Sequence, residues 1–167
     1  SSLWRAYAQG FPVGYRDAVT PRAAVRDIAA VEKLDPAAPY SVSLYRPVES
    51  DERTLRLRVY RQGLPLPLSA SLPVLENMGL EVLDEASWEI ERAGREPVFL
   101  HDFGMRSARA VPDVEGVKAI TEQALALRFG IQGIPTMIVF SNGEPELRIT
   151  GAMGKPQLEA KLGSYLE

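Results

Sequence analysis

The fold is decided by residues 54–82, TLRLRVYRQGLPLPLSASLPVLENMGLEV, in a chain of 167 residues. From Thr54 to Arg61 polar and apolar residues alternate, which is typical of a strand with one buried face. The turn Gly63–Pro67 is rich in proline, and Ser69 then stands where a helix N-cap is expected. Apolar residues at helical spacing follow, and Gly79 is placed to end the helix. The stretch therefore predicts a strand, a loop and a helix, with these side chains turned inward from the strand: Leu55, Leu57 and Val59.

The residues that follow continue the alternation of strands and helices. Leu80–Glu91 and Glu96–Met105 are predicted strands joined by a short turn, so they should be antiparallel. A helix is predicted from about Val114 to Phe129, and another strand over Ile134–Phe140. From Thr54 the order is therefore βαββαβ, the ferredoxin-like order, within the α/β (α+β) class.

The two ends of the chain complete this plan. Residues 1–38 are predicted to form a helical arm that packs through aromatic side chains, and Tyr40–Arg46 alternates like a further strand. A last strand, Glu146–Thr150, is joined to its predecessor by an Asn-Gly turn, and a final helix begins near Lys155.

Composition excludes several classes of function. The absence of cysteine excludes disulfides, thiol redox catalysis and cysteine-ligated metal. A net charge of −3 argues against a nucleic-acid partner, and the longest apolar runs are too short to span a membrane. No glycine-rich dinucleotide turn follows a predicted strand, so no cofactor is expected. The default expectation is a cytoplasmic protein without metal, cofactor or catalytic residues.

Spaced segments between Leu3 and Arg106 follow one another in a familiar order. They are Phe11-Pro12 with Gly14-Tyr15-Arg16, Leu44–Pro47, Leu64–Ser69, Leu72–Leu80 and His101–Phe103. This order resembles the N-terminal, ACT-like region of the large bacterial NAD-specific glutamate dehydrogenases. In that family the region precedes the catalytic core, so the resemblance implies a regulatory or scaffolding module that does not itself oxidise glutamate.

A second resemblance covers about Ala124–Glu167. Arg128–Thr136 resembles the stretch across the cis-proline loop of thioredoxins, and Val139–Gly143 resembles the turn between their last two strands. The resemblance implies a cis bond at Ile134-Pro135, with a structural role for Pro135 in the absence of a dithiol.

The two resemblances together suggest a natural fusion or a chimera, joined between about 106 and 124. The expected division is a helical arm over 1–38, an ACT-like part over 39–112 and a thioredoxin-like part over 113–167. The last two parts are expected to share one sheet, with the hairpin extending it and the final helix covering one face.

The loop 62–69 is the candidate effector site. In ACT-like domains small effectors, often amino acids, bind at such a loop near a subunit interface. Here Gly63 and Ser69 are the candidate residues, because a helix N-terminus offers free N–H groups to a carboxylate. The alternative is a plain proline-rich turn. A homodimer through a sheet edge is the other expected partnership.

Three charged features are weighed against ordinary structural roles. His101-Asp102 would point to opposite faces of a strand, so a surface or sheet-edge histidine is favoured over a catalytic dyad. The carboxylates between Glu81 and Glu91 are expected to form a solvated strand face. The arginines from Arg53 to Arg61 either bind an anion or, as favoured here, form ion pairs with the acidic strand beside them.

Three functions remain open at this point. The first is a non-catalytic regulatory or scaffolding module. The second is a fragment of a full-length NAD-dependent glutamate dehydrogenase whose catalytic core lies elsewhere. The third is a redox-inactive thioredoxin-like protein that binds peptides through the loop at Pro135.

Overall fold

A computed structural model describes residues 6–7, 9–131, 136–141, 144–150 and 155–163. The chain divides into two compact units, Ser1–Ile131 and Gln132–Glu167, which we describe separately. No helix within the described ranges is long and apolar enough to cross a membrane.

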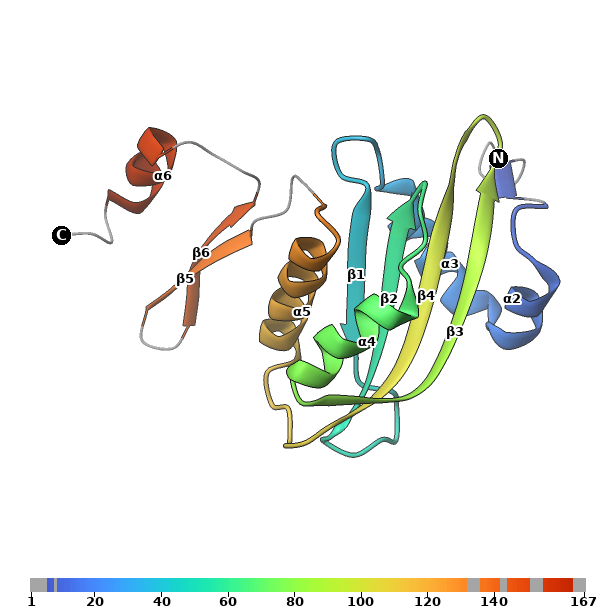
Figure 1. The fold of residues 1–167 in the computed structure, drawn as a ribbon, viewed down its shortest axis with the longest axis horizontal. Helices are drawn as coiled ribbons and strands as arrows, with labels where there is room; N and C mark the ends of the chain where they lie inside the picture. Colours follow the sequence, from blue (N-terminus) through green and yellow to red (C-terminus); the bar gives the residue numbers. More distant parts are fainter. Residues whose placement is uncertain (1–5, 8, 132–135, 142–143, 151–154, 164–167) are drawn as a thin grey trace. The chain divides into compact units, whose positions relative to one another are not determined.

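The first unit is built on a four-stranded antiparallel sheet (Figure 1). Its strand order is β1-β2-β4-β3. The bounds of these strands are β1 Tyr40–Tyr45, β2 Thr54–Gln62, β3 Leu80–Arg92 and β4 Arg95–Ser107. The strand, loop and helix predicted from residues 54–82 are confirmed as β2, the turn after it and α4 (Leu68–Asn77). The α+β, ACT-like class is therefore correct.

The position beside β2 is filled from an unexpected part of the sequence. The predicted βαββαβ order assigns the strand after the second helix to this sheet. In the structure the strand before β2 is there instead: β1 pairs with β2 from Tyr40↔Arg61 to Tyr45↔Arg56. The second helix, α5 (Val114–Arg128), packs on β1. The reason is local, since β1 and β2 are close in sequence and pair as an antiparallel hairpin without a crossover.

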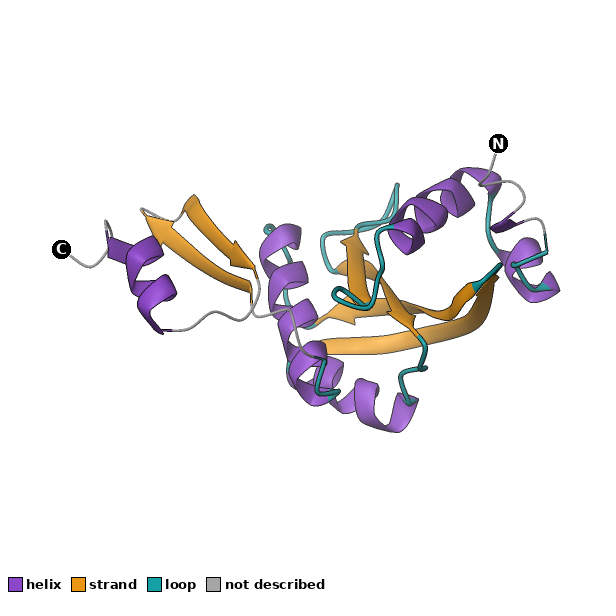
Figure 2. Ribbon diagram, turned by 90° about the horizontal axis from the view of Figure 1, so that it is seen from above, coloured by secondary structure: helices purple, strands orange, loops and turns teal. Residues whose placement is uncertain are grey.

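Helices cover both faces of the sheet (Figure 2). Helices α4 and α5 pack together on one face, which we call the helix-pair face. Helices α2 (Val13–Ala18) and α3 (Pro21–Glu32) lie on the other, which we call the arm face. The alternation of β2 directs its side chains accordingly: Leu55, Leu57, Val59 and Arg61 to the helix-pair face, Arg56, Arg58 and Tyr60 to the arm face.

The arm docks through aromatic side chains. The rings of Tyr7, Phe11 and Tyr15 form a stack, and Trp88 of β3 meets Tyr15 edge-on at 5.4 Å between centroids. At Gly10 the backbone reaches the edge of β3, where the Glu91 N–H donates to the Gly10 carbonyl over 2.9 Å. A side chain at position 10 would collide with the Glu91 carbonyl, so this approach requires glycine.

The second unit consists of a hairpin and a helix. Its elements are β5 (Thr136–Ser141), β6 (Glu144–Thr150) and α6 (Lys155–Leu162). The hairpin and the helix were predicted, but β5 and β6 form a two-stranded sheet of their own. The expectation of one continuous sheet shared with the preceding part is therefore wrong. The predicted boundary at 112/113 also differs from the structural one, because α5 belongs to the first unit. The predicted cis bond at Pro135 lies outside the described residues.

Candidate functional site

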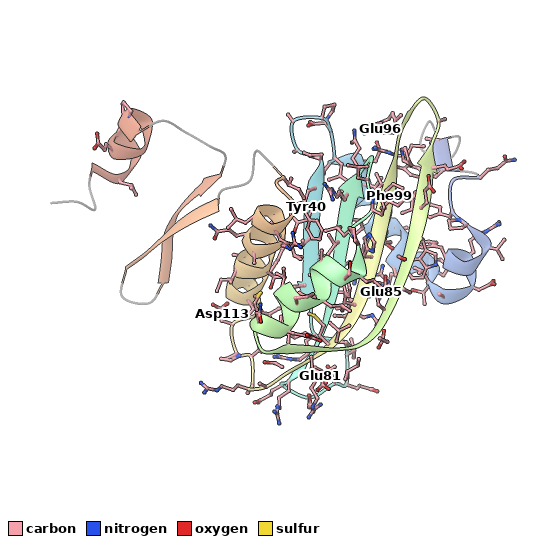
Figure 3. All side chains as sticks on the ribbon, in the orientation of Figure 1. Tyr40, Glu81, Glu85, Glu96, Phe99 and Asp113 are labelled. Atoms are coloured by element: carbon pink, nitrogen blue, oxygen red, sulfur yellow. The ribbon has the colours of Figure 1, made fainter. Side chains whose placement is uncertain are left out.

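The candidate site is the β2–α4 loop, in which Gly63 has a φ of +82°. That left-handed conformation favours glycine. The Gly63 N–H donates to the Pro97 carbonyl over 2.9 Å, and a Cβ at this position would lie 3.3 Å from Glu96 Oε1. Figure 3 shows Glu96, Phe99 and Tyr40 at this end of the sheet, with Glu81 and Asp113 at the other. The conformation of Gly63 thus fixes the start of the loop against the β3–β4 hairpin.

The middle of the loop is held from beneath by His101. The Leu66 N–H donates to His101 Nε2 over 3.0 Å, and both residues are buried. The predicted surface or sheet-edge histidine is therefore wrong, because β4 is a central strand and α4 covers its helix-pair face. Burial and the nearby Arg61 charge lower the pKa of His101 to about 4. The imidazole is thus neutral at neutral pH, with Nε2 as the acceptor and the proton on Nδ1.

Glu85 of β3 lies next to this histidine. Its Oε1 is 3.6 Å from His101 Nδ1, and neither atom has a hydrogen-bond partner among the described residues. Burial raises the pKa of Glu85, and the Asp102 charge adds to that effect. The prediction of a uniformly solvated acidic strand therefore fails at Glu85, which lies under the helix pair.

Ser69 does not cap α4 as predicted. The helix begins at Leu68, and the N-cap is Pro67, which makes no side-chain cap bond. Ser69 stands exposed in the first turn, at the opposite end of the loop from Gly63. The two predicted effector residues thus bracket the loop, while the side chains that hold it from below, His101 and Arg61, were missed.

Arg61 is a cation that contacts the loop backbone. Its Nη1 lies 3.4 Å from the Pro65 carbonyl, and its guanidinium stands 5.6 Å from the centroid of the Phe129 ring, just after α5. Burial lowers the pKa of Arg61. A signal for this placement was present in the sequence, because position 61 shares the inward alternation of Leu55, Leu57 and Val59.

The arm face carries a different set of charges. Asp27 of α3 accepts hydrogen bonds from Tyr15, Tyr60 and Arg58, all between 2.5 and 2.7 Å. Burial alone would lower the pKa of Arg58, but the hydrogen bond and attraction to Asp27 raise it overall. Asp102 binds both Arg58 Nη2, at 3.1 Å, and Arg56 Nε, at 2.7 Å.

These contacts bear on two predictions. Of the arginines of β2, Arg56 and Arg58 form ion pairs across strands, and Arg61 forms none among the described residues. The acidic strand β3 does not lie beside β2 as predicted, because β4 lies between them, but Arg56 still reaches Asp84 of β3 at 2.8 Å. Arg58 and Tyr60 alternate with the inward-facing Leu57 and Val59, but they are not exposed to solvent, because the arm buries both. His101 and Asp102 do lie on opposite faces.

Comparison with known proteins gives two family matches. Residues 39–124 match the glutamate dehydrogenase ACT3 domain, and residues 1–34 match helical motif 2 of glutamate dehydrogenase. The chain belongs to the glutamate dehydrogenase ACT3 domain family. The ACT3 match covers the whole four-stranded sheet, and the helical motif 2 match covers α2 and α3.

Three relatives are each called NAD-specific glutamate dehydrogenase. The protein of Halomonas elongata is 35% identical over 109 residues, which is 65% of this chain and 7% of the relative. That of Pseudomonas aeruginosa is 33% identical over 119 residues, 71% of this chain and 7% of the relative. That of Mycobacterium tuberculosis is 31% identical over 106 residues, 64% of this chain and 6% of the relative. The chain thus spans less than a tenth of the length of these relatives.

Neither family match extends past residue 124. The thioredoxin-like segment over 124–167 and the chimera gain no support from these comparisons and stay predictions. The ACT3 domain and helical motif 2 are instead the two parts that the structure joins: Asp27 belongs to the helical motif, and its partners Arg58 and Tyr60 belong to the ACT3 sheet.

Proposed function

We propose that this chain is a non-catalytic regulatory part of a longer NAD-specific glutamate dehydrogenase. The observation that carries the proposal is the match of its sheet to the ACT3 domain of that enzyme. The relatives support it, since they carry the enzyme's name and this chain spans only 6–7% of their length. Oxidation of glutamate would then take place in another part of such a protein. The cytoplasmic location stays a prediction.

The regulatory role we propose is the binding of a small amino-acid effector at the β2–α4 loop, between Gly63 and Ser69. The loop is held in one shape before any ligand binds: Gly63 bonds to Pro97, and Leu66 bonds to His101. A loop fixed in this way loses little conformational freedom on binding, which favours a small ligand. A scaffolding role without an effector is the alternative.

Titration calorimetry of the chain with a panel of amino acids tests this proposal. We expect heat with at least one amino acid and its loss in Gly63→Val, whose side chain would project towards Glu96. The matched control is Gly79→Val, which also places a side chain at positive φ, 76°, but at the other end of α4. No heat from any amino acid would refute the effector role, and equal loss in both variants would assign the effect to backbone strain.

The predicted homodimer remains a proposal about the sheet edges. The arm lies along part of the β3 edge through Gly10, and no strand of the described residues pairs with the outer edge of β1. An open edge strand presents unpaired backbone groups that a second copy can pair with. Sedimentation velocity over a range of concentrations tests it, and a monomer at every concentration would refute it.

A further inference from the structure

Arg61 differs from the other two arginines of β2. Arg56 and Arg58 each contact aspartate on the arm face, at 2.6–3.1 Å. Arg61, on the helix-pair face, forms no ion pair with any residue that the structure describes. A guanidinium removed partly from water without a counterion is unfavourable, so its retention needs an explanation.

The groups that do contact Arg61 are neutral. The Pro65 carbonyl lies 3.4 Å away, at the long limit of a hydrogen bond, and the Phe129 ring faces the guanidinium at 5.6 Å. His101 carries no charge near neutral pH. The hydroxyl of Tyr40, across the strand pair, donates to the Glu122 carbonyl over 3.2 Å. These contacts orient the guanidinium and leave its charge for another partner.

Apolar side chains stand exposed around the same loop. Leu64 is 61% exposed, and Leu68, at the start of α4, is 40% exposed. The Pro65 residue itself is exposed, so its carbonyl can accept a second hydrogen bond beside the guanidinium. A cation, an acceptor and apolar surface thus meet at one loop.

We propose that Arg61 binds the carboxylate of an amino acid that has an apolar side chain. The inference rests on the effector role proposed above and names its ligand class and its anchoring residue. The guanidinium donates to both carboxylate oxygens, as such forks do in bidentate pairs. The Pro65 carbonyl accepts from the ammonium group, and Leu64 and Leu68 contact the apolar side chain.

The test uses calorimetry of the whole chain with three probes and three variants. L-leucine carries the carboxylate, the ammonium and the apolar side chain, leucinamide lacks the carboxylate, and 4-methylpentanoate lacks the ammonium. We expect leucine to bind, leucinamide to bind at least about tenfold more weakly, and Arg61→Gln to weaken leucine by at least about tenfold. Arg61→Lys keeps the positive charge but lacks the planar guanidinium. Its affinity for leucine should lie between the affinities of the unaltered chain and of Arg61→Gln. Arg106→Gln, which alters an exposed arginine at the other end of the sheet, should leave binding unchanged.

The outcomes separate this inference from the effector role. Suppose that leucine binds the unaltered chain. If it binds Arg61→Gln equally well, or if leucinamide binds the unaltered chain as well as leucine does, the anchoring role of Arg61 is refuted while the effector role stands. If no amino acid binds the unaltered chain, both are refuted. Thermal unfolding of each variant checks the fold, and Arg61→Lys provides the comparison if the glutamine variant unfolds.

Discussion

The two faces of the ACT3 sheet differ in how their buried charged groups are paired. On the arm face, buried charges are paired: Asp27, Arg58, Asp102 and Arg56 form a connected chain of ion pairs with tyrosine hydroxyls at one end. On the helix-pair face, Glu85 Oε1 and His101 Nδ1 are buried without a hydrogen-bond partner among the described residues, and Arg61 forms no ion pair with them. On the arm face Arg58 Nε also lacks a hydrogen bond, but the Nη atoms of Arg58 are paired with Asp27 and Asp102. Paired networks stabilise the contact between parts of a protein, whereas a buried polar group without a partner requires an explanation such as a bound ligand or water. The arm face thus fastens helical motif 2, and the helix-pair face carries the loop.

Removing Asp27 should produce the largest effect. Asp27 is 1% exposed, and Asp27→Ala would leave the buried Arg58 and two tyrosine hydroxyls without this acceptor. We expect a loss of about 3 kcal/mol in the free energy of unfolding, measured by urea denaturation. Arg58 still pairs with Asp102 in this variant. The expected loss in the free energy of unfolding is therefore at the lower end of the range for a broken buried ion pair.

Asp84→Ala is the matched control for that measurement. The side chain of Asp84 is 59% exposed and also binds an arginine of β2. Its removal should cost about 0.5 kcal/mol, as for other surface pairs. Equal losses in the two variants would contradict the distinction between the buried and the exposed ion pairs of the arm face.

His101→Leu should have an intermediate effect. The variant removes the acceptor of the buried Leu66 N–H, and an unsatisfied buried donor costs about 2 kcal/mol. Hydrogen exchange provides a local readout, because the Leu66 amide should exchange faster while amides of the arm face keep their protection. A Leu66 amide that exchanges as before would show that His101 does not hold the loop.

Acidification should weaken the helix-pair face by a smaller amount. The folded-state pKa of His101, about 4, lies below its unfolded value, so protons bind preferentially to the unfolded chain. The contribution of neutral His101 is therefore complete above the unfolded pKa and is lost as the pH falls towards 4. Glu85, with its raised pKa, acts in the opposite sense and offsets part of this loss.

Urea denaturation at about pH 7 and about pH 5 measures the acid effect, which we expect to be about 2 kcal/mol for His101 alone, before the offset from Glu85. In His101→Leu that part of the pH dependence should be absent. If the free energy of unfolding of His101→Leu changes with pH as much as that of the unaltered chain, the acid sensitivity belongs to other groups.

The sequence predicted the positions of strands and helices better than it predicted which side chains are buried. Alternation from Thr54 to Arg61 correctly placed β2, and helical spacing after Ser69 placed α4, because both periods are local properties of the backbone. Alternation states that Arg58 lies opposite Leu57, but it does not state that another segment covers that face. The arm buries Arg58 because Asp27, 31 positions earlier, supplies the counter-charge.

The candidate site was predicted only in outline. Gly63 has a φ of +82° at the turn where glycine precedes proline-rich residues, and its predicted role in binding an effector stays a prediction. His101 was misplaced because its hydrogen-bond partner, the Leu66 N–H, is a backbone group that no side-chain pattern reveals. Arg61 shows the opposite case, because its alternation with Leu57 and Val59 already indicates its inward position.

The position of β1 beside β2 has a consequence for the order in which the molecule assembles during synthesis. All four strands of the ACT3 sheet come from residues 40–107, and the edge next to β2 is occupied before α5 is made. In a ferredoxin-like order that edge would wait for a strand beyond α5. A nascent chain of this kind pairs its sheet from the N-terminal side first, with the helical motif already available to cover the arm face as the polypeptide leaves the ribosome.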